Sequence, residues 1–122
     1  MPTRKGYSVS PLFGDRKGRI VGERFWRDAS DRLTFDSSRV DAVDYAKACR
    51  AIADALNLTP YGKLVVGLDQ MFWDFRREDR VIGLDWDIWM GLIVVAKSES
   101  SESLVQEIAI WLGASRWSVA AE

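Results

Sequence analysis

A chain of 122 residues, 48% hydrophobic and 29% charged, has the composition of a globular protein and can bury a core without cross-links. No apolar run approaches the roughly 20 residues that a membrane-spanning helix needs, and no apolar segment follows the basic N-terminus as it does in a secretory signal. One cysteine and no histidine exclude an intramolecular disulfide, a multi-cysteine metal site and catalysis by a histidine base. We therefore expect a single cytoplasmic domain over residues 1–122, with no membrane partner.

The formal net charge of −1 conceals an asymmetry along the chain. Residues 1–67 carry 12 Lys and Arg against 8 Asp and Glu, whereas residues 68–122 carry 5 against 10. If the two regions form different faces, the acidic one attracts a basic partner, and if they pack together they neutralise each other. The sequence leaves both alternatives open.

The N-terminal part of the chain reads as a loop followed by a hairpin. Residues 1–18 combine glycines with basic side chains, which predicts a loop-rich, mobile arm. Weak alternation over residues 19–27 and again over 33–35 predicts two strands. The turn-like residues 28–31 between them predict a hairpin.

A helix is predicted next. Ser37 and Ser38 are candidate N-caps, because Asp41 follows Ser38 at the spacing of a capping box. The helix is expected to continue to about Asn57. Its predicted apolar face consists of residues at helical spacing, which are Val40, Val43, Ala46, Cys49, Ile52, Ala53 and Leu56.

The second half of the chain predicts an antiparallel meander and a second helix. Residues 63–70 are ambiguous between a short strand and a loop. Alternating residues over 71–76 and 82–88, then the continuously apolar stretch 92–96, predict three strands joined by connections too short for parallel crossovers. Apolar spacing over 104–112 predicts a helix that stops at Gly113. The expected order is β-β-α-β-β-β-α, an α+β fold with a mostly antiparallel sheet and two helices on one face.

Carboxylates are the main candidates for chemistry or recognition. Asp85 and Asp87 lie two apart on a predicted strand and therefore share a face, and Asp74 on the neighbouring strand comes within reach if the register allows. Three converging carboxylates could bind Mg²⁺ or Ca²⁺ or serve as acid and base. The alternative, which we favour, is that they bind a partner, satisfy turn amides, or pair with the nearby arginines Arg76, Arg77 and Arg80.

Six tryptophans and one cysteine complete the set of notable residues. Trp86 is expected in the core, since it shares the apolar side of its strand. Trp89 falls in the turn after that strand, where a large indole must fold back or face a partner, and tryptophan is a favoured interface anchor. Cys49 is expected to act as a small core hydrophobe.

The segment Asp-Trp-Asp-Ile-Trp-Met-Gly-Leu-Ile-Val-Val-Ala at residues 85–96, followed by a helix, resembles small bacterial immunity proteins of polymorphic toxin and contact-dependent inhibition systems. The resemblance extends over about residues 64–112. It implies a compact cytoplasmic α+β domain that binds a cognate toxin and blocks it.

These observations favour a non-enzymatic protein-binding module, with a cognate protein toxin as partner and no cofactor or metal. The partner-binding residues would be Asp74, Asp85, Asp87 and Trp89, because an acidic, aromatic-anchored surface can cover a basic toxin domain. A nucleic-acid module is an alternative disfavoured by the acidic pI, and a carboxylate enzyme is a third; a homo-oligomer stays open. In the nucleic-acid alternative, the basic and aromatic residues that contact the nucleic acid would be Arg4, Lys5, Arg16, Lys17, Arg19, Arg24 and Arg27 with Phe25 and Trp26.

Overall fold

The structure is a computed structural model that describes residues 25–115, and its backbone divides into two compact units, Met1–Phe35 and Asp36–Glu122. The predicted arm at residues 1–18 lies outside the described residues. In the first unit, β1 (Phe25–Arg27) pairs antiparallel with residues 33–35, the first part of β2 (Leu33–Ser37), with Phe25 opposite Phe35. The turn between the strands is held by Asp28, whose Oδ1 accepts the backbone N–H groups of Ser30 and Arg32 at 2.9 and 3.0 Å. The predicted first hairpin is therefore confirmed within the described residues.

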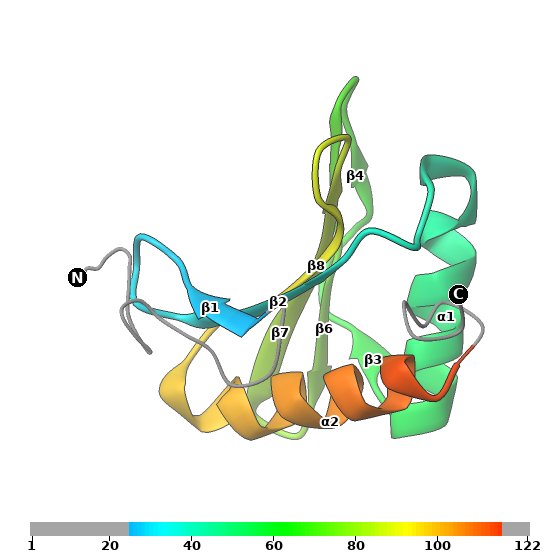
Figure 1. Cartoon of the computed structure of the whole chain (residues 1–122). Helices are drawn as coiled ribbons and strands as arrows, with labels where there is room; N and C mark the ends of the chain where they lie inside the picture. The colour runs from blue at the N-terminus through cyan, green and yellow to red at the C-terminus, as the bar shows by residue number, and fades with distance from the viewer. Residues whose placement is uncertain (1–24, 116–122) are drawn as a thin grey trace. The chain divides into compact units, whose positions relative to one another are not determined.

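The second unit contains two helices and six short strands, which confirms the α+β class (Figure 1). The helical elements are the 3₁₀ turns η1 (Ala42–Asp44) and η2 (Glu99–Ser101) and the helices α1 (Tyr45–Leu56) and α2 (Glu102–Gly113). The strands are β3 (Thr59–Pro60), β4 (Val65–Val66), β5 (Gln70–Phe72), β6 (Asp74–Arg77), β7 (Arg80–Asp87) and β8 (Gly91–Ala96).

The start of α1 differs from the predicted one. Ser37 and Ser38 are not helix caps, because Ser37 ends β2 and the chain then passes through a 3₁₀ turn whose N-cap is Asp41. Val43, predicted on the apolar face, lies in this turn and is 89% exposed. The end is as predicted: Asn57 adopts a left-handed conformation, φ 62°, and its N–H bonds to Ala53 O.

All strand pairs of the second unit are antiparallel. Neighbouring strands follow the order β8-β7-β5-β4, and β6 pairs with both β7 and β3. Strands β5 and β6 keep one register along β7, with Met71 opposite Trp86 and Asp74 opposite Gly83. The predicted meander is thus confirmed. The expected order β-β-α-β-β-β-α did not include β3, and it left the region of β4 open between a short strand and a loop, because strands of two residues leave no periodic pattern in a sequence.

Both helices cover one face of this sheet. On β7 and β8 the paired residues Ile82 and Ala96, Leu84 and Val94, and Trp86 and Leu92 are all buried. The same face of β5 and β6 carries alternate residues from Trp73 to Arg77. Helix α1 reaches it at its middle and at its C-terminal end: the Arg50 guanidinium lies 5.7 Å from the Trp73 ring centre, and Leu56 O accepts a hydrogen bond from Arg77. Helix α2 reaches it through Glu107, which pairs with Arg77 at 2.8 Å.

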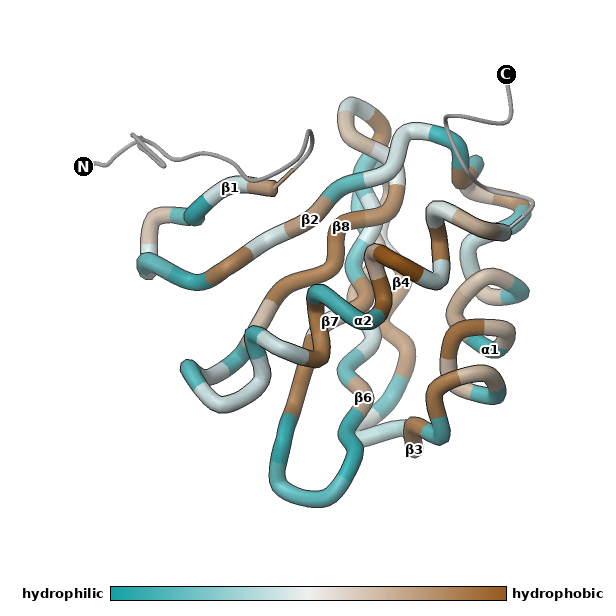
Figure 2. The backbone as a smooth tube through the Cα atoms, turned by 60° about the horizontal axis from the view of Figure 1, so that its bottom comes forward, coloured by the Kyte–Doolittle hydropathy of each residue, from teal (hydrophilic) through white to brown (hydrophobic). Residues whose placement is uncertain are grey.

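Two hydrogen bonds tie the middle of β7 to the segment that contains α1. The Trp86 indole N–H donates to Val40 O at 2.8 Å, and Trp86 is only 9% exposed, as predicted for a core residue. The Tyr45 hydroxyl donates to Leu84 O, and burial raises the pKa of Tyr45, so the hydroxyl keeps its proton. Figure 2 shows the hydrophobic stretches along β7 and β8 and the hydrophilic turn between β6 and β7.

Gly91, the first residue of β8, fits a position that no other residue can fill without strain. Its φ is +79°, and a Cβ built there would overlap Ser37 O and come within 2.9 Å of Ser38 Cα. Both neighbours are backbone atoms, which cannot rotate away as a side chain would.

We expect Gly91→Ala to destabilise the protein by more than about 2 kcal/mol, because it combines a left-handed backbone with a backbone overlap. Gly113→Ala is the control: nothing lies within 4 Å of its added Cβ, and we expect a gain of up to about 1 kcal/mol. Urea unfolding of the three proteins measures both changes. Equal free energies of unfolding for the two variants would contradict the close packing at Gly91.

Candidate functional site

The predicted carboxylates lie on the sheet face opposite the helices. We call this face the carboxylate face and define it by Phe72, Asp74, Gly83, Asp85 and Asp87. The assignment follows from the alternation of side chains along each strand and from the register, in which Asp74 lies opposite Gly83. Sequence reasoning foresaw that Asp85 and Asp87 share a face, and the register adds Asp74 to it.

Asp74 and Asp85 come together over Gly83. A Cβ on Gly83 would lie 3.3 Å from Asp74 Oδ1, 3.2 Å from Asp85 Oδ1 and 3.0 Å from Lys97 Cε. The missing side chain of Gly83 therefore leaves the space into which two carboxylates and one lysine converge. Gly83 was not recognised as part of the site from the sequence, since a glycine in a strand is more often read as a bulge.

Lys97, and not one of the three nearby arginines, is the cation beside this pair. Lys97 Nζ lies 3.9 Å from Asp74 Oδ1, and both side chains are about 40% exposed (41% and 38%), so the ion pair is weak. Arg77 lies on the helix face with Glu107, and the Arg76 guanidinium stacks 5.2 Å from the Tyr61 ring centre. Arg76 and Arg77 are therefore engaged with other residues and not with Asp74 or Asp85.

Asp85 is the most perturbed carboxylate of the site. Its Oδ1 is buried and has no hydrogen-bond partner among the described residues. The pKa of Asp85 is raised from 3.8 to about 6, mainly by burial and to a lesser extent by the charge of Asp74, while Lys97 and the backbone of Trp73 act in the opposite direction. The folded protein is therefore less stable with Asp85 ionised than with Asp85 protonated.

Asp87 organises the turn between β7 and β8. Its Oδ1 accepts the backbone N–H groups of Trp89 at 2.9 Å and Met90 at 2.7 Å. This is the turn-amide alternative that the sequence left open. The carboxylate thereby fixes the backbone that carries Trp89, so Asp87 acts through its neighbour as well as through its charge.

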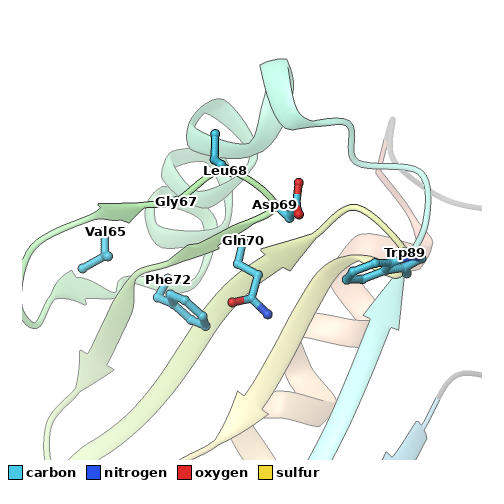
Figure 3. Close-up of a pocket in the computed structure, with 7 residues that line it drawn as sticks. All are labelled: Val65, Gly67, Leu68, Asp69, Gln70, Phe72 and Trp89. Carbon is cyan, nitrogen blue, oxygen red and sulfur yellow. The ribbon is translucent and has the colours of Figure 1, made fainter.

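Trp89 is 75% exposed and borders a shallow hollow of about 280 Å³. Figure 3 shows Gln70 extending between Phe72 on β5 and Trp89 on the β7–β8 turn. The hollow is lined by Val65, Gly67, Leu68, Asp69, Gln70, Phe72 and Trp89. Figure 1 shows the β4–β5 hairpin and the β7–β8 turn projecting together at the top of the view, away from α2.

Large apolar side chains gather at this projecting end. Those exposed by more than 40% are Val65, Val66, Leu68, Phe72, Ile88 and Trp89. We call these residues together with Asp69 and Gln70 the tip surface. Only Trp89 was recognised from the sequence. Val65, Val66 and Leu68 were missed because the sequence of residues 63–70 is equally consistent with a loop packed on the core. Phe72 and Ile88 were missed because each continues the alternation of a predicted strand.

The remaining candidates for chemistry are less prominent. Cys49 is fully buried, and burial raises the pKa of its thiol to about 12, while the nearby Tyr45 hydroxyl has a smaller effect in the opposite direction. Within residues 25–115, no three His, Cys, Asp or Glu side chains are grouped so that they could hold a metal ion. Of the basic residues proposed for nucleic acid, only Arg27 lies within the described part of the chain, next to Trp26 in β1.

Comparison with known proteins identified no relative: no family model, no curated protein and no solved structure matches the chain. None of the helices within residues 25–115 is long and apolar enough to cross a membrane.

The raised pKa of Asp85 makes stability depend on pH. Because the pKa is about 6 in the folded protein and near 3.8 in the unfolded chain, the folded state binds the proton more tightly. The stabilising effect of that proton is complete below about pH 4 and is lost as the pH rises through 6. We therefore expect Asp85→Asn to raise the melting temperature at pH 7.5 and to have little effect at pH 4.5.

Asp54→Asn on the exposed side of α1 is the matched control and should show no such pH-dependent difference. Melting temperatures from pH 4 to 8 measure the effect. If Asp85→Asn is less stable than the natural protein at pH 7.5, the ionised carboxylate has a stabilising partner and the burial argument is wrong.

Proposed function

We propose that this protein is a non-enzymatic protein-binding module, and specifically an immunity protein that binds and neutralises a cognate bacterial toxin in the cytoplasm. The observation that carries the proposal is the position of Trp89: an exposed indole on a fixed turn, bordering a hollow within a cluster of exposed apolar side chains. Clusters of this kind on a protein surface mark interaction sites more often than scattered apolar residues do.

Trp89 has the properties of an interface anchor. The backbone N–H groups of Trp89 and Met90 both donate to Asp87, so little backbone freedom remains to be lost at this turn when a partner binds. A tryptophan buried at the centre of an interface often contributes more than 2 kcal/mol to binding. Phe72 and Gln70 offer a ring face and an amide beside it, which suit a partner side chain with an apolar stem and a polar end.

The charges around the tip surface favour a basic partner. Asp69 lies within it, and Asp74, Asp85 and Asp87 follow along the carboxylate face, with Lys97 as the cation next to Asp74. An acidic field speeds the approach of a basic protein and discourages acidic ones. A toxin that acts on nucleic acid has a basic surface matched to phosphate, which is the kind of surface that such a field attracts.

The test begins with capture of the partner by the tagged full chain from the native host, followed by binding kinetics. We expect Trp89→Ala to weaken binding by about 30-fold or more through faster dissociation, with little dependence on salt. Ile110→Ala is the matched control, because Ile110 on α2 is equally exposed at 75%. Both variants should keep the melting temperature of the natural protein.

Neutralising Asp85 and Asp87 tests the electrostatic part. Asparagine keeps a side-chain oxygen that can accept the two turn N–H groups, so Asp85→Asn/Asp87→Asn should remain folded. We expect the double variant to associate with the partner more slowly than the natural protein at low salt, with a difference that shrinks as ionic strength rises.

If Trp89→Ala and Ile110→Ala bind the captured partner equally well, the tip surface is not the interface and the proposed site is wrong.

A further inference from the structure

Two aromatic side chains of the second unit are each stacked against an arginine of the same chain. The Arg50 guanidinium lies 5.7 Å from the Trp73 ring centre, and the Arg76 guanidinium lies 5.2 Å from that of Tyr61. A cation is attracted to the face of an aromatic ring, which carries the negative part of its quadrupole. Trp89 is more exposed than Tyr61, yet among residues 25–115 no cation or second ring stacks on it. Its indole is therefore open to a cation from outside the chain.

The hollow beside Trp89 also contains an unengaged carboxylate. Of the described residues that line the hollow, Asp69 alone is charged. Its side chain is exposed and forms no ion pair or hydrogen bond with another residue in the described part of the chain. Asp87 and Asp74 differ, because Asp87 accepts two turn N–H groups and Asp74 pairs with Lys97. The carboxylate of Asp69 is thus available to a cation that enters the hollow.

Backbone hydrogen bonds hold the two sides of the hollow together. Ile88 N–H donates to Asp69 O at 3.2 Å, which ties the turn of the β4–β5 hairpin to the β7–β8 turn that carries Trp89 (Figure 3). Gly67 N–H donates to Gln70 O at 2.8 Å and closes the hairpin turn. The backbone that positions the indole and the carboxylate is therefore fixed before any ligand binds, which lowers the entropic cost of binding.

The lining of the hollow fits an arginine side chain better than a lysine or an apolar one. A guanidinium is planar and weakly hydrated, so it can stack on a ring and also bond to a carboxylate through two parallel N–H groups. A lysine ammonium is compact and strongly hydrated. An apolar side chain would bury the polar groups of Asp69 and Gln70 without satisfying them, which is unfavourable. The apolar side chains of Val65, Leu68 and Phe72 suit the aliphatic stem of an arginine.

We propose that the hollow of the tip surface binds an arginine side chain of the partner, whose guanidinium stacks on Trp89 and pairs with the carboxylate of Asp69. This inference rests on the proposed function, since it names the group of the partner that the tip surface recognises. An ion pair exposed to water contributes little by itself. When the partner covers the hollow and excludes water, both the ion pair and the stacking become stronger.

A titration followed by NMR tests the hollow without the partner. The probe is an arginine residue blocked by a glycine on each side, acetylated and amidated, added to the full chain at constant ionic strength. We expect the indole N–H signal of Trp89 and the side-chain amide signals of Gln70 to shift, with a dissociation constant in the millimolar range. The matched peptide with citrulline keeps the shape of arginine but not its charge, and it should bind at least about tenfold more weakly. The matched lysine peptide should bind more weakly than the arginine peptide.

Variants of Asp69 test the role of the carboxylate. Asp69→Asn should raise the dissociation constant of the arginine peptide about threefold, and that of the captured partner about tenfold, because the pair is shielded from water in the complex. Asp69→Glu keeps the charge and should retain most of both affinities. Asp79→Asn is the matched control, since Asp79 is an exposed carboxylate in the turn between β6 and β7, and it should change neither constant.

Equal binding of the arginine and citrulline peptides, or no shift of the Trp89 signal with either, would overturn the arginine site. Equal partner binding by Asp69→Asn and Asp79→Asn would also overturn it. The proposed function fails by a separate result, namely that Trp89→Ala binds the captured partner as well as Ile110→Ala does. An arginine peptide that still binds at the hollow in that case would support the selectivity of the hollow for arginine and refute its use by the partner.

Discussion

The architecture depends on how β7 is held. It pairs along most of its length with β5 and β6 on one edge and with β8 on the other. The Trp86 indole then bonds to Val40 O across 46 residues of sequence, and the Tyr45 hydroxyl bonds to Leu84 O. Both bonds are buried, where an unsatisfied polar group would cost about 1–3 kcal/mol, so they fix the position of the chain before α1 relative to the sheet.

This rigid centre determines what the two faces of β7 can do. Leu84 and Trp86 are buried, so their face of β7 belongs to the core. Side chains alternate along a strand, so the other face carries Gly83, Asp85 and Asp87. Asp85 stays partly buried beside Asp74 although its ionised form is penalised there. A carboxylate kept at such a cost is more often found at a functional site than elsewhere, which agrees with a binding role for this face.

The tip surface is a consequence of the same geometry. The β4–β5 hairpin and the β7–β8 turn extend past the helices, so both sides of the hairpin face solvent (Figure 1). Asp87 and Gly91 hold the turn in one conformation, the first through hydrogen bonds to Trp89 and Met90 and the second through its left-handed backbone. An apolar surface on a fixed backbone is suited to bind without first being ordered.

Much of this could be read from the sequence where a pattern was long enough. The alternation around Trp86 predicted the core face and the shared face of Asp85 and Asp87, and helical spacing predicted α1 and α2. The caps at Ser37 and Ser38 were wrong because β2 extends to Ser37. Residues 63–70 were left open between a short strand, which β4 is, and a loop. The exposed hollow beside Phe72 could not be predicted, since exposure at the end of a hairpin depends on where distant helices stop.

Val66 illustrates the same limit at the edge of the sheet. In the sequence it is one valine within an apolar run. Its outward backbone groups follow only from the hydrogen bond between Gly67 and Gln70, which sets the register of the hairpin.

Amide hydrogen exchange of the chain, alone and with its captured partner, tests most directly the claim that a rigid sheet presents the tip surface to another protein. The account predicts slow exchange in β7 and β8 in both states, and new protection on binding confined to residues 65–72 and 87–90. Protection that appears instead over α1 or α2, with the tip unchanged, would contradict it.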